Sequence, residues 1–304
     1  MKKRFIAILL AAILSVCLGV NPSLAATKGK IVVGSKEFTE QRILGNLLIE
    51  VLNDAGFDAE DKTGLGGTLV VREALKNDQI NVYMAYNGTI LMTALKHKTP
   101  ITDPAECYEV VKKEDLEKNG IAWLSPTTVN NTYCLVMRRD HAESLGIKTL
   151  SDLAAYISKD KKALKVGLNA EFYARPDGFP KLKKAYGFKV PMSQIVKMRS
   201  GLLYNAIRDE QADVTVAFAT DGRIKGFDLV VLEDDKKFFP AYTVAPIMKQ
   251  ALIEKYPELP QVLKPLTDAL TDTEMTRLNY QVDIEKKQVK DVARAWLKER
   301  GIIK

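Results

Sequence analysis

The chain has 304 residues, of which 46% are hydrophobic and 27% are charged. This balance is that of an ordinary globular protein, and the length is sufficient for two hydrophobic cores. The formal net charge of +7 is distributed in runs of mixed sign, without a basic stripe that alternates with aromatic residues. The composition therefore does not favour a nucleic-acid-binding protein.

The first 25 residues are typical of a secretory signal peptide. A basic start at 2–4 precedes an apolar run over 5–20, and small residues precede a cleavage after Ala25. The run is short for a transmembrane helix. Cys17 raises the alternative of a lipoprotein, but Val16 stands where lipidation sites have a small residue, so no lipid anchor is expected. We expect a soluble periplasmic protein, whose charge falls to +4 without the three basic residues of the leader.

The mature chain begins with a strand and a helix. Ile31–Val33 is a short apolar run, and apolar residues then recur at helical spacing from Ile43 to Leu52, with Thr39 as the predicted N-cap. Lys36 lies in the turn between them, where open α/β sheets bind ligands and free backbone N–H groups favour an anion. The alternative, a solvated lysine in an ordinary turn, stays open.

Two further junctions follow in the same half of the chain. Residues 64–68 form a glycine-rich turn before a helix over 69–76, but the spacing fits neither a dinucleotide fingerprint nor a Walker motif. A strand over 80–86 then leads into a helix through Leu95. Tyr86 and Thr89 therefore lie at a second strand-to-helix junction, level with Lys36 if the sheet is parallel.

The remaining elements predict a second lobe. Strand-like runs alternate with helical patterns, and the last part of the chain is helical; the strands cover 121–124, 132–137, 165–168, 213–219 and 229–232. Such alternation indicates parallel α/β sheets. We expect a first lobe of 30–134 and 243–304 and an inserted second lobe of 135–242, joined by two crossings. A cleft between two lobes is a common ligand site.

Catalysis has little support in the sequence. His97 lies between lysines and His141 in a polar turn, and neither a GxSxG nor an HExxH motif is present. We expect no enzymatic activity, no metal and no cofactor. Cys107 and Cys134 could form a disulfide in an exported protein. If Tyr133 faces the cleft, strand alternation buries Cys134, which favours two buried thiols and leaves the disulfide state open.

Aromatic residues stand at the ends of several predicted strands, beside polar turns. They are Tyr86, Tyr133, Phe218 and Tyr242. Core packing is the usual alternative for any single ring. Gathered at one edge with Lys36 and Arg175, these rings would suit a ligand with a bulky cation and an anion. Aromatic faces hold a cation that cannot donate hydrogen bonds, and an arginine fork holds a carboxylate.

Six motifs in sequence order resemble the substrate-binding proteins of osmoprotectant ABC importers, which take up glycine betaine, carnitine, choline and related compounds. The motifs are GSKEFTEQ (34–41), GLGGT (64–68), YNGT (86–89), NNTY (130–133), TDGRI (220–224) and LEDDK (232–236). The resemblance implies a two-lobed periplasmic-binding-protein fold of type II. Its sheets are mainly parallel with flanking helices, and two crossover strands form the hinge. It also implies closure on a ligand and docking on a membrane permease with a cytoplasmic ATPase; we expect a monomer.

The same resemblance implies roles for individual residues. It assigns an aromatic cage to Tyr86, Tyr133, Phe218 and Tyr242. It assigns the groups that hold a carboxylate to Lys36, Thr89 and Arg175, and a polar contact beside the cation to Asn131. Glu171 is expected at the rim of the cleft.

Of the departures from the family pattern, three bear on the choice of ligand. They are Ala85, Asn87 and Phe218, where the family often has Glu, Thr and Tyr. A larger betaine is compatible with them. The alternatives are the same fold with another solute, such as a cationic amino acid, a sensor module without transport, and a secreted enzyme on a two-lobed scaffold.

Overall fold

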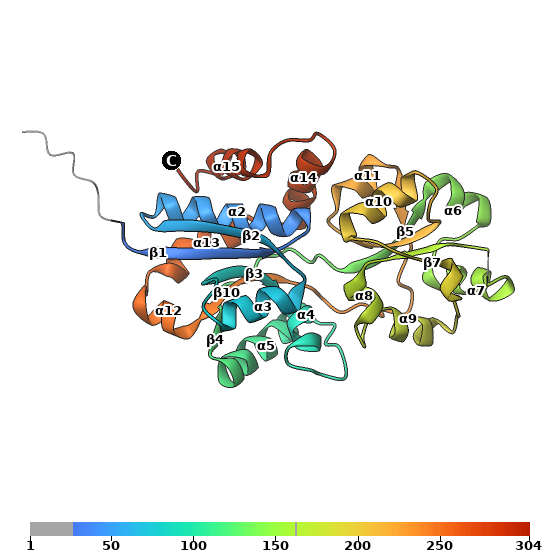
Figure 1. Cartoon of the computed structure of the whole chain (residues 1–304), viewed down its shortest axis with the longest axis horizontal. Helices are drawn as coiled ribbons and strands as arrows, with labels where there is room; N and C mark the ends of the chain where they lie inside the picture. The colour runs from blue at the N-terminus through green and yellow to red at the C-terminus, as the bar shows by residue number, and fades with distance from the viewer. Residues whose placement is uncertain (1–26, 162) are drawn as a thin grey trace, which may run out of the picture.

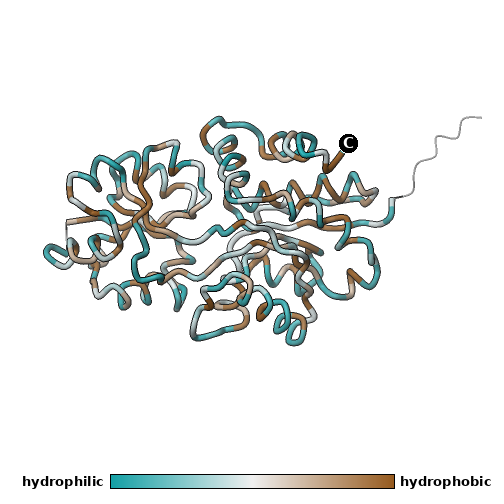
Figure 2. Tube along the Cα trace, turned by 180° about the vertical axis from the view of Figure 1, so that it is seen from behind, coloured by the Kyte–Doolittle hydropathy of each residue, from teal (hydrophilic) through white to brown (hydrophobic). Residues whose placement is uncertain are grey.

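The computed structural model describes residues 27–161 and 163–304. They form two lobes, each with one five-stranded sheet between helices (Figure 1). Hydrophobic residues concentrate in the central strands of both lobes (Figure 2). The predicted signal peptide, its cleavage position and Cys17 lie outside the described residues.

The first lobe contains a mixed sheet in the order β2-β1-β3-β10-β4. Its strands are β1 (Lys30–Lys36), β2 (Asp58–Gly66), β3 (Val82–Tyr86), β4 (Ile121–Trp123) and β10 (Val244–Lys249). β1 pairs in parallel with β2 and β3, whereas β10 is antiparallel to β3 and β4. The helices in this part of the chain are α2 (Thr39–Asp54), α3 (Thr68–Lys76), α4 (Asn87–Thr93) and α5 (Pro104–Asn119).

The second sheet has the same construction, in the order β7-β6-β8-β5-β9. Its strands are β5 (Tyr133–Arg138), β6 (Val166–Leu168), β7 (Ile195–Lys197), β8 (Val214–Phe218) and β9 (Leu229–Val231). β5 is antiparallel to β8 and β9. The helices are α6 (Arg139–Leu145), α7 (Leu150–Lys159), α8 (Ala170–Ala174), α9 (Phe179–Tyr186), η1 (Met192–Gln194), α10 (Ser200–Arg208) and α11 (Gly222–Gly226).

The chain crosses between the sheets twice, and the two crossings lie side by side (Figure 1). Asn130 and Thr243 form an antiparallel bridge at this point. β5 and β10 follow the two crossings, and each is antiparallel to its neighbours because it enters its sheet from the hinge. The predicted lobe limits at 134/135 and 242/243 stay a prediction.

Helix α2 is the central helix of the first lobe. It packs on β1 and β2 and is also covered by C-terminal helices, so apolar residues on several sides are buried. The C-terminal helices are α12 (Gln250–Lys255), α13 (Leu259–Ala269), α14 (Asp272–Asp283) and α15 (Val289–Glu299). The predicted N-cap role of Thr39 is wrong: the helix begins at this residue, and its hydroxyl donates to Asp283 Oδ1 at 2.8 Å.

Cys107 and Cys134 are both buried and free of a disulfide, which agrees with the preference for two buried thiols and settles the disulfide state that the sequence left open. Burial raises the pKa of Cys107 to about 12 and raises that of Cys134 as well. Both thiols therefore stay protonated at neutral pH.

Helix α14 contacts both lobes, because it packs on α2 of the first lobe and on α11 of the second. The approach is close: a Cβ added at Gly222 would lie 2.5 Å from the backbone N and Cα of Tyr280. An ion pair of 3.3 Å between Arg223 Nη2 and Asp283 Oδ2 lies beside this contact. The two lobes are therefore in contact outside the crossings too.

We expect Gly222→Ala to destabilise the protein, because the added methyl group meets backbone atoms that cannot rotate away. Overpacking of this kind costs about 1–3 kcal/mol. Urea unfolding measures the loss, and Gly201→Ala is the matched control, since its Cβ would meet only Arg223 Nη1, at 3.5 Å. Equal stability of the two variants would contradict the close packing of α11 on α14.

Candidate functional site

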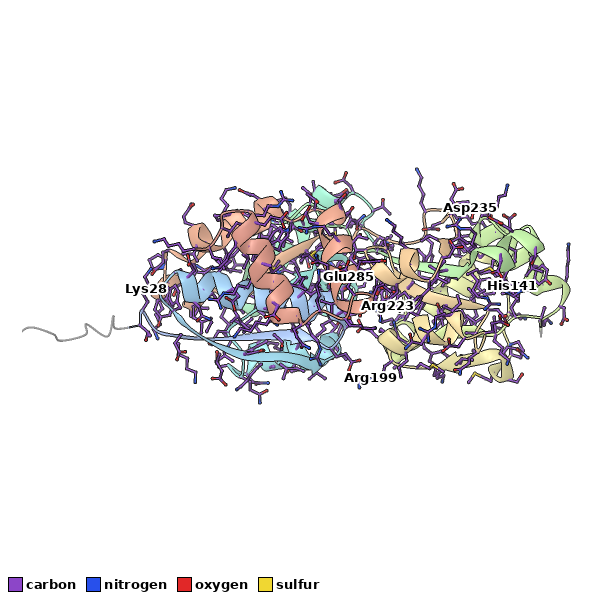
Figure 3. All side chains as sticks on the ribbon, turned by 90° about the horizontal axis from the view of Figure 1, so that it is seen from above. Lys28, His141, Arg199, Arg223, Asp235 and Glu285 are labelled. Carbon is purple, nitrogen blue, oxygen red and sulfur yellow. The ribbon has the colours of Figure 1, made fainter. Side chains whose placement is uncertain are left out.

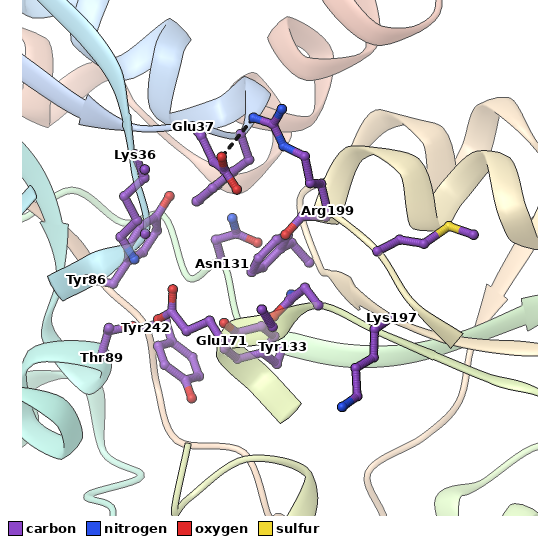
Figure 4. Close-up of a pocket in the computed structure, with 18 residues that line it drawn as sticks. Lys36, Glu37, Tyr86, Thr89, Asn131, Tyr133, Glu171, Lys197, Arg199 and Tyr242 are labelled. Carbon is purple, nitrogen blue, oxygen red and sulfur yellow. Dashed lines mark hydrogen bonds and ion pairs between the residues drawn. The ribbon is translucent and has the colours of Figure 1, made fainter. Parts of the chain in front are cut away.

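A cavity of about 430 Å³ lies between the lobes, at the ends of β1 and β3 on one side and of β5 and β8 on the other (Figure 4). Seven of the eight residues that the sequence predicts for the site line it: Lys36, Tyr86, Thr89, Asn131, Tyr133, Phe218 and Tyr242. Arg175 does not line it, whereas Glu171 does. Residues from both sheets and from the crossings thus share one cavity.

The aromatic rings form a contiguous group. The ring centre of Tyr133 lies 5.0 Å from that of Phe218 and 5.7 Å from that of Tyr242, the latter edge-to-face. Phe38 joins this group, stacked on Phe218 at 4.8 Å and 6.3 Å from Tyr86. Phe38 is not among the residues predicted for the site, although it stands at the same strand-to-helix junction as Lys36.

Lys36 places a positive charge on this aromatic group. Its Nζ lies 5.0 Å from the ring centre of Tyr86 and 6.0 Å from that of Phe38. The residue is only 6% exposed, and burial lowers the pKa of its ammonium group, against the attraction of Glu171. The face of Tyr86 therefore already carries a cation that belongs to the protein.

Glu171, on α8, reaches across the cleft to the first lobe. Its Oε1 accepts a hydrogen bond of 2.8 Å from the Thr68 hydroxyl, at the first turn of α3. Burial opposes its ionisation, but Lys36 and Arg175 outweigh burial, so the pKa of Glu171 is lowered. The glycine-rich turn before α3 therefore faces a carboxylate of the protein itself.

Arg175 is held away from the cavity by neighbouring carboxylates. Its Nε and Nη2 donate to Asp177 at 3.0 and 2.6 Å, and its Nη1 lies 3.4 Å from Glu171 Oε1. Its guanidinium carbon lies 5.8 Å from the ring centre of Tyr133. In this arrangement the guanidinium group of Arg175 contacts the ring of Tyr133 and the carboxylate of Glu171. To bind a ligand carboxylate with its fork, Arg175 would have to break its hydrogen bonds to Asp177.

Of the three departures from the family pattern, only Phe218 lines the cavity. Asn87 is fully buried, and its side-chain oxygen accepts the Thr243 N–H at 2.8 Å. Ala85 is buried within β3. Asn87 therefore affects the hinge and Ala85 the core. Phe218 affects the cavity wall, because it lacks the hydroxyl group of a tyrosine.

Contacts between the lobes surround the cavity. At the rim, Arg199 Nη2 of the second lobe lies 2.8 Å from Glu37 Oε2 of the first (Figure 4). Phe38 on Phe218 and Thr68 with Glu171 are further contacts between the sheets. In this structure the two lobes are therefore closed around the cavity.

Neither histidine of the chain lines the cavity. Figure 3 shows Arg199 and Arg223 where the two lobes meet, whereas His141 lies farther out on the second lobe. His97 pairs with Glu114 at 3.0 Å, outside the cavity wall. Over 27–161 and 163–304, no helix is long and apolar enough to cross a membrane, and no group of His, Cys, Asp and Glu could hold a metal ion.

Known proteins are similar to this sequence over nearly its whole length. Residues 29–299 match the family model described as the substrate-binding domain of the ABC-type glycine betaine transport system. The glycine-betaine-binding protein of Pseudomonas aeruginosa is 36% identical over 292 residues, 94% of this chain and 93% of that protein. The carnitine transport binding protein OpuCC of Listeria monocytogenes is 32% identical over 309 residues, 99% of this chain and 98% of that protein.

A solved structure agrees with these relatives. The crystal structure of a glycine betaine/carnitine/choline ABC transporter protein matches with a TM-score of 0.72 at 31% identity, over 90% of this chain and 99% of that chain. The predicted type II periplasmic-binding-protein fold is confirmed. The family consists of periplasmic or extracellular solute receptors that deliver their ligand to a permease and its ATPase. The chain belongs to this family, the substrate-binding domains of ABC-type glycine betaine transport systems.

Proposed function

We propose that this protein captures a quaternary-ammonium osmolyte between its lobes and delivers it to an ABC importer. The ligand class is glycine betaine, carnitine, choline or a related betaine. The observation that carries the proposal is the convergence of Tyr86, Tyr133, Phe218 and Tyr242 on one cavity. A methylated ammonium group donates no conventional hydrogen bond, so ring faces are its best partners, at about 0.5–2 kcal/mol for each contact.

The polar end of the ligand would meet Lys36, Thr89 and Asn131. Because Glu171 faces Lys36 across the cavity, a ligand carboxylate has to share Lys36 with it. Arg175 joins the ligand-binding set in this proposal only after release from Asp177. Phe218 offers a ring face without a hydroxyl, which suits the methylated end of the ligand.

The same proposal places the protein in the periplasm, after removal of residues 1–25 and without a lipid on Cys17. It acts as a monomer and changes no bond of its ligand, with no cofactor. The protonated thiols and the distance of both histidines from the cavity support a receptor over an enzyme.

One observation favours a second candidate, a cationic amino acid as the ligand. That reading requires a carboxylate near the rings, and Glu171 lines the cavity. Isothermal titration against glycine betaine, carnitine, choline, proline betaine, ergothioneine, lysine and arginine separates the two. We expect saturable binding of at least one methylated ammonium compound and none of lysine or arginine; the reverse pattern would replace the proposal with the second candidate.

We expect Tyr133→Ala and Tyr242→Ala to weaken ligand binding by about tenfold or more, because each removes a ring face and its apolar area. Titration calorimetry on the folded variants measures the effect. Tyr186→Ala is the matched control, a buried tyrosine outside the cavity whose hydroxyl bonds to Asp234. If the loss of affinity in all three variants were only as large as their loss of stability explains, Tyr133 and Tyr242 would have no direct role in ligand binding.

We expect Glu171→Gln to shift selectivity by about tenfold from choline towards glycine betaine. Neutralising Glu171 frees Lys36 for a ligand carboxylate and removes a charge that attracts a purely cationic ligand. The ratio of the two dissociation constants is the measurement. Glu37→Gln, which neutralises an acid at the rim, is the control. An unchanged ratio in Glu171→Gln would contradict the shared role of Lys36.

We expect Arg175→Ala to weaken binding of glycine betaine and carnitine more than binding of choline, because only the first two carry a carboxylate. Arg175→Lys keeps the charge but lacks the fork that binds a carboxylate through two parallel bonds, and it should recover part of the loss. If Arg175→Ala weakened the binding of all three ligands equally, Arg175 would not bind the ligand carboxylate, and its role would be to hold Tyr133 in place.

A further inference from the structure

A second buried carboxylate, Glu40, lies behind the cavity. It occupies the first turn of α2 and is 3% exposed. Over the described parts of the chain it forms no ion pair within 4.0 Å, so its partners are neutral donors. Burying a carboxylate that contacts no cation costs free energy, unless hydrogen bonds replace its lost hydration.

Four side chains donate hydrogen bonds to Glu40. Its Oε1 accepts from the Tyr86 hydroxyl at 2.8 Å and from Asn131 Nδ2 at 2.7 Å. Its Oε2 accepts from Asn279 Nδ2 at 3.0 Å and from the Thr220 hydroxyl. The donors come from β3, a crossing between the lobes, α14 and the segment after β8.

The bonding pattern is that of an ionised carboxylate. Asn131 Oδ1 accepts the Thr220 N–H at 3.3 Å, and Asn279 Nδ2 also donates to the Thr220 carbonyl at 2.9 Å, so both amides direct N–H groups at Glu40. Burial raises the pKa of Glu40, and the bonds from Thr220, Tyr86, Asn279 and Asn131 oppose that rise. The position in the first turn of a 16-residue helix also favours a negative charge.

Two of the four donors, Tyr86 and Asn131, also line the cavity. Only one side chain therefore separates Glu40 from a ligand bound in the cavity. A phenol that donates to a carboxylate also has a more negative ring face, which strengthens its attraction for a cation. The Nζ of Lys36 lies 5.0 Å from the ring centre of Tyr86, and the charges of Glu171 and Glu40 both attract it, against the burial that lowers its pKa.

We propose that Glu40 determines specificity as a positioning residue: through Tyr86 and Asn131 it selects a cation in the cavity over a neutral ligand of the same shape. The inference rests on the proposed function and names the residue behind the cage that supplies the negative charge. Because Thr220 belongs to the second lobe, the hydrogen bonds of Glu40 are complete only when the lobes are together. Cation binding and closure therefore share one carboxylate.

The test compares choline with 3,3-dimethyl-1-butanol, in which a carbon atom replaces the charged nitrogen. Both dissociation constants are measured by titration on the wild type and on Glu40→Gln. We expect the preference for choline to fall by about tenfold in Glu40→Gln, mostly through weaker choline binding. Thr220→Val removes one bond but keeps the charge, and it should weaken both ligands to the same degree. Glu50→Gln, on the same helix with its partner Arg294, should change neither.

Equal losses for the charged and the neutral ligand in Glu40→Gln would overturn the inference and leave the proposed function intact. A wild type that binds no methylated ammonium compound would overturn the proposed function itself. Tyr86→Phe covers the case in which Glu40→Gln fails to fold, because it keeps both the ring and Glu40 but removes the hydrogen bond between them. It should reduce the preference for choline by about threefold; an unchanged preference would overturn the inference.

Discussion

The aromatic cavity depends on how the two crossings between the lobes are held against the end of β3. Asn87 pairs with Thr243 through two hydrogen bonds, from its backbone N–H at 3.0 Å and to its side-chain oxygen at 2.8 Å. The N–H of Tyr242 donates to Asn130 Oδ1 at 2.7 Å. Because these bonds fix Tyr242 beside Tyr86, residues that are more than 150 positions apart form one wall. Asn87, one of the departures from the family pattern, thus helps to fix this wall of the cavity.

Buried charges determine which end of a ligand each part of the cavity can accept. Arg175 is neutralised by Asp177, and Lys36 faces Glu171, so neither cation is free for a ligand carboxylate at no cost. Glu40 has only neutral donors. Lys36 is attracted by Glu40 as well as by Glu171, so the buried carboxylates Glu40, Glu171 and Asp177 outnumber the cations Lys36 and Arg175. In the proposed function, this excess of negative charge favours the cationic end of a betaine at the rings.

Much of the site could be predicted from the sequence, because the ends of parallel strands meet at one edge of a sheet. Lys36, Tyr86 and Thr89 follow from that rule alone. Strand β2 could not be predicted, since its run of charged residues lacks alternation and pairs as an edge strand only through β1. Glu40 was missed for a similar reason: an acid in a first helical turn is normally solvated, and its donors come from distant segments.

The direct contacts between the lobes stabilise the closed form that binds the ligand, but some of them also occupy surface that the ligand would cover. Phe38 stacks on Phe218 at 4.8 Å, so part of the aromatic surface that a methylated cation would cover is already covered by the protein. The pair of Glu37 with Arg199 at the rim and the bond of Thr68 to Glu171 hold the same arrangement. A ligand gains affinity from closure only to the extent that it binds the closed form better than the open one. The stronger these direct contacts are, the less of the ligand's affinity comes from movement of the lobes, and the more comes from the match between Glu40, the rings and a cation.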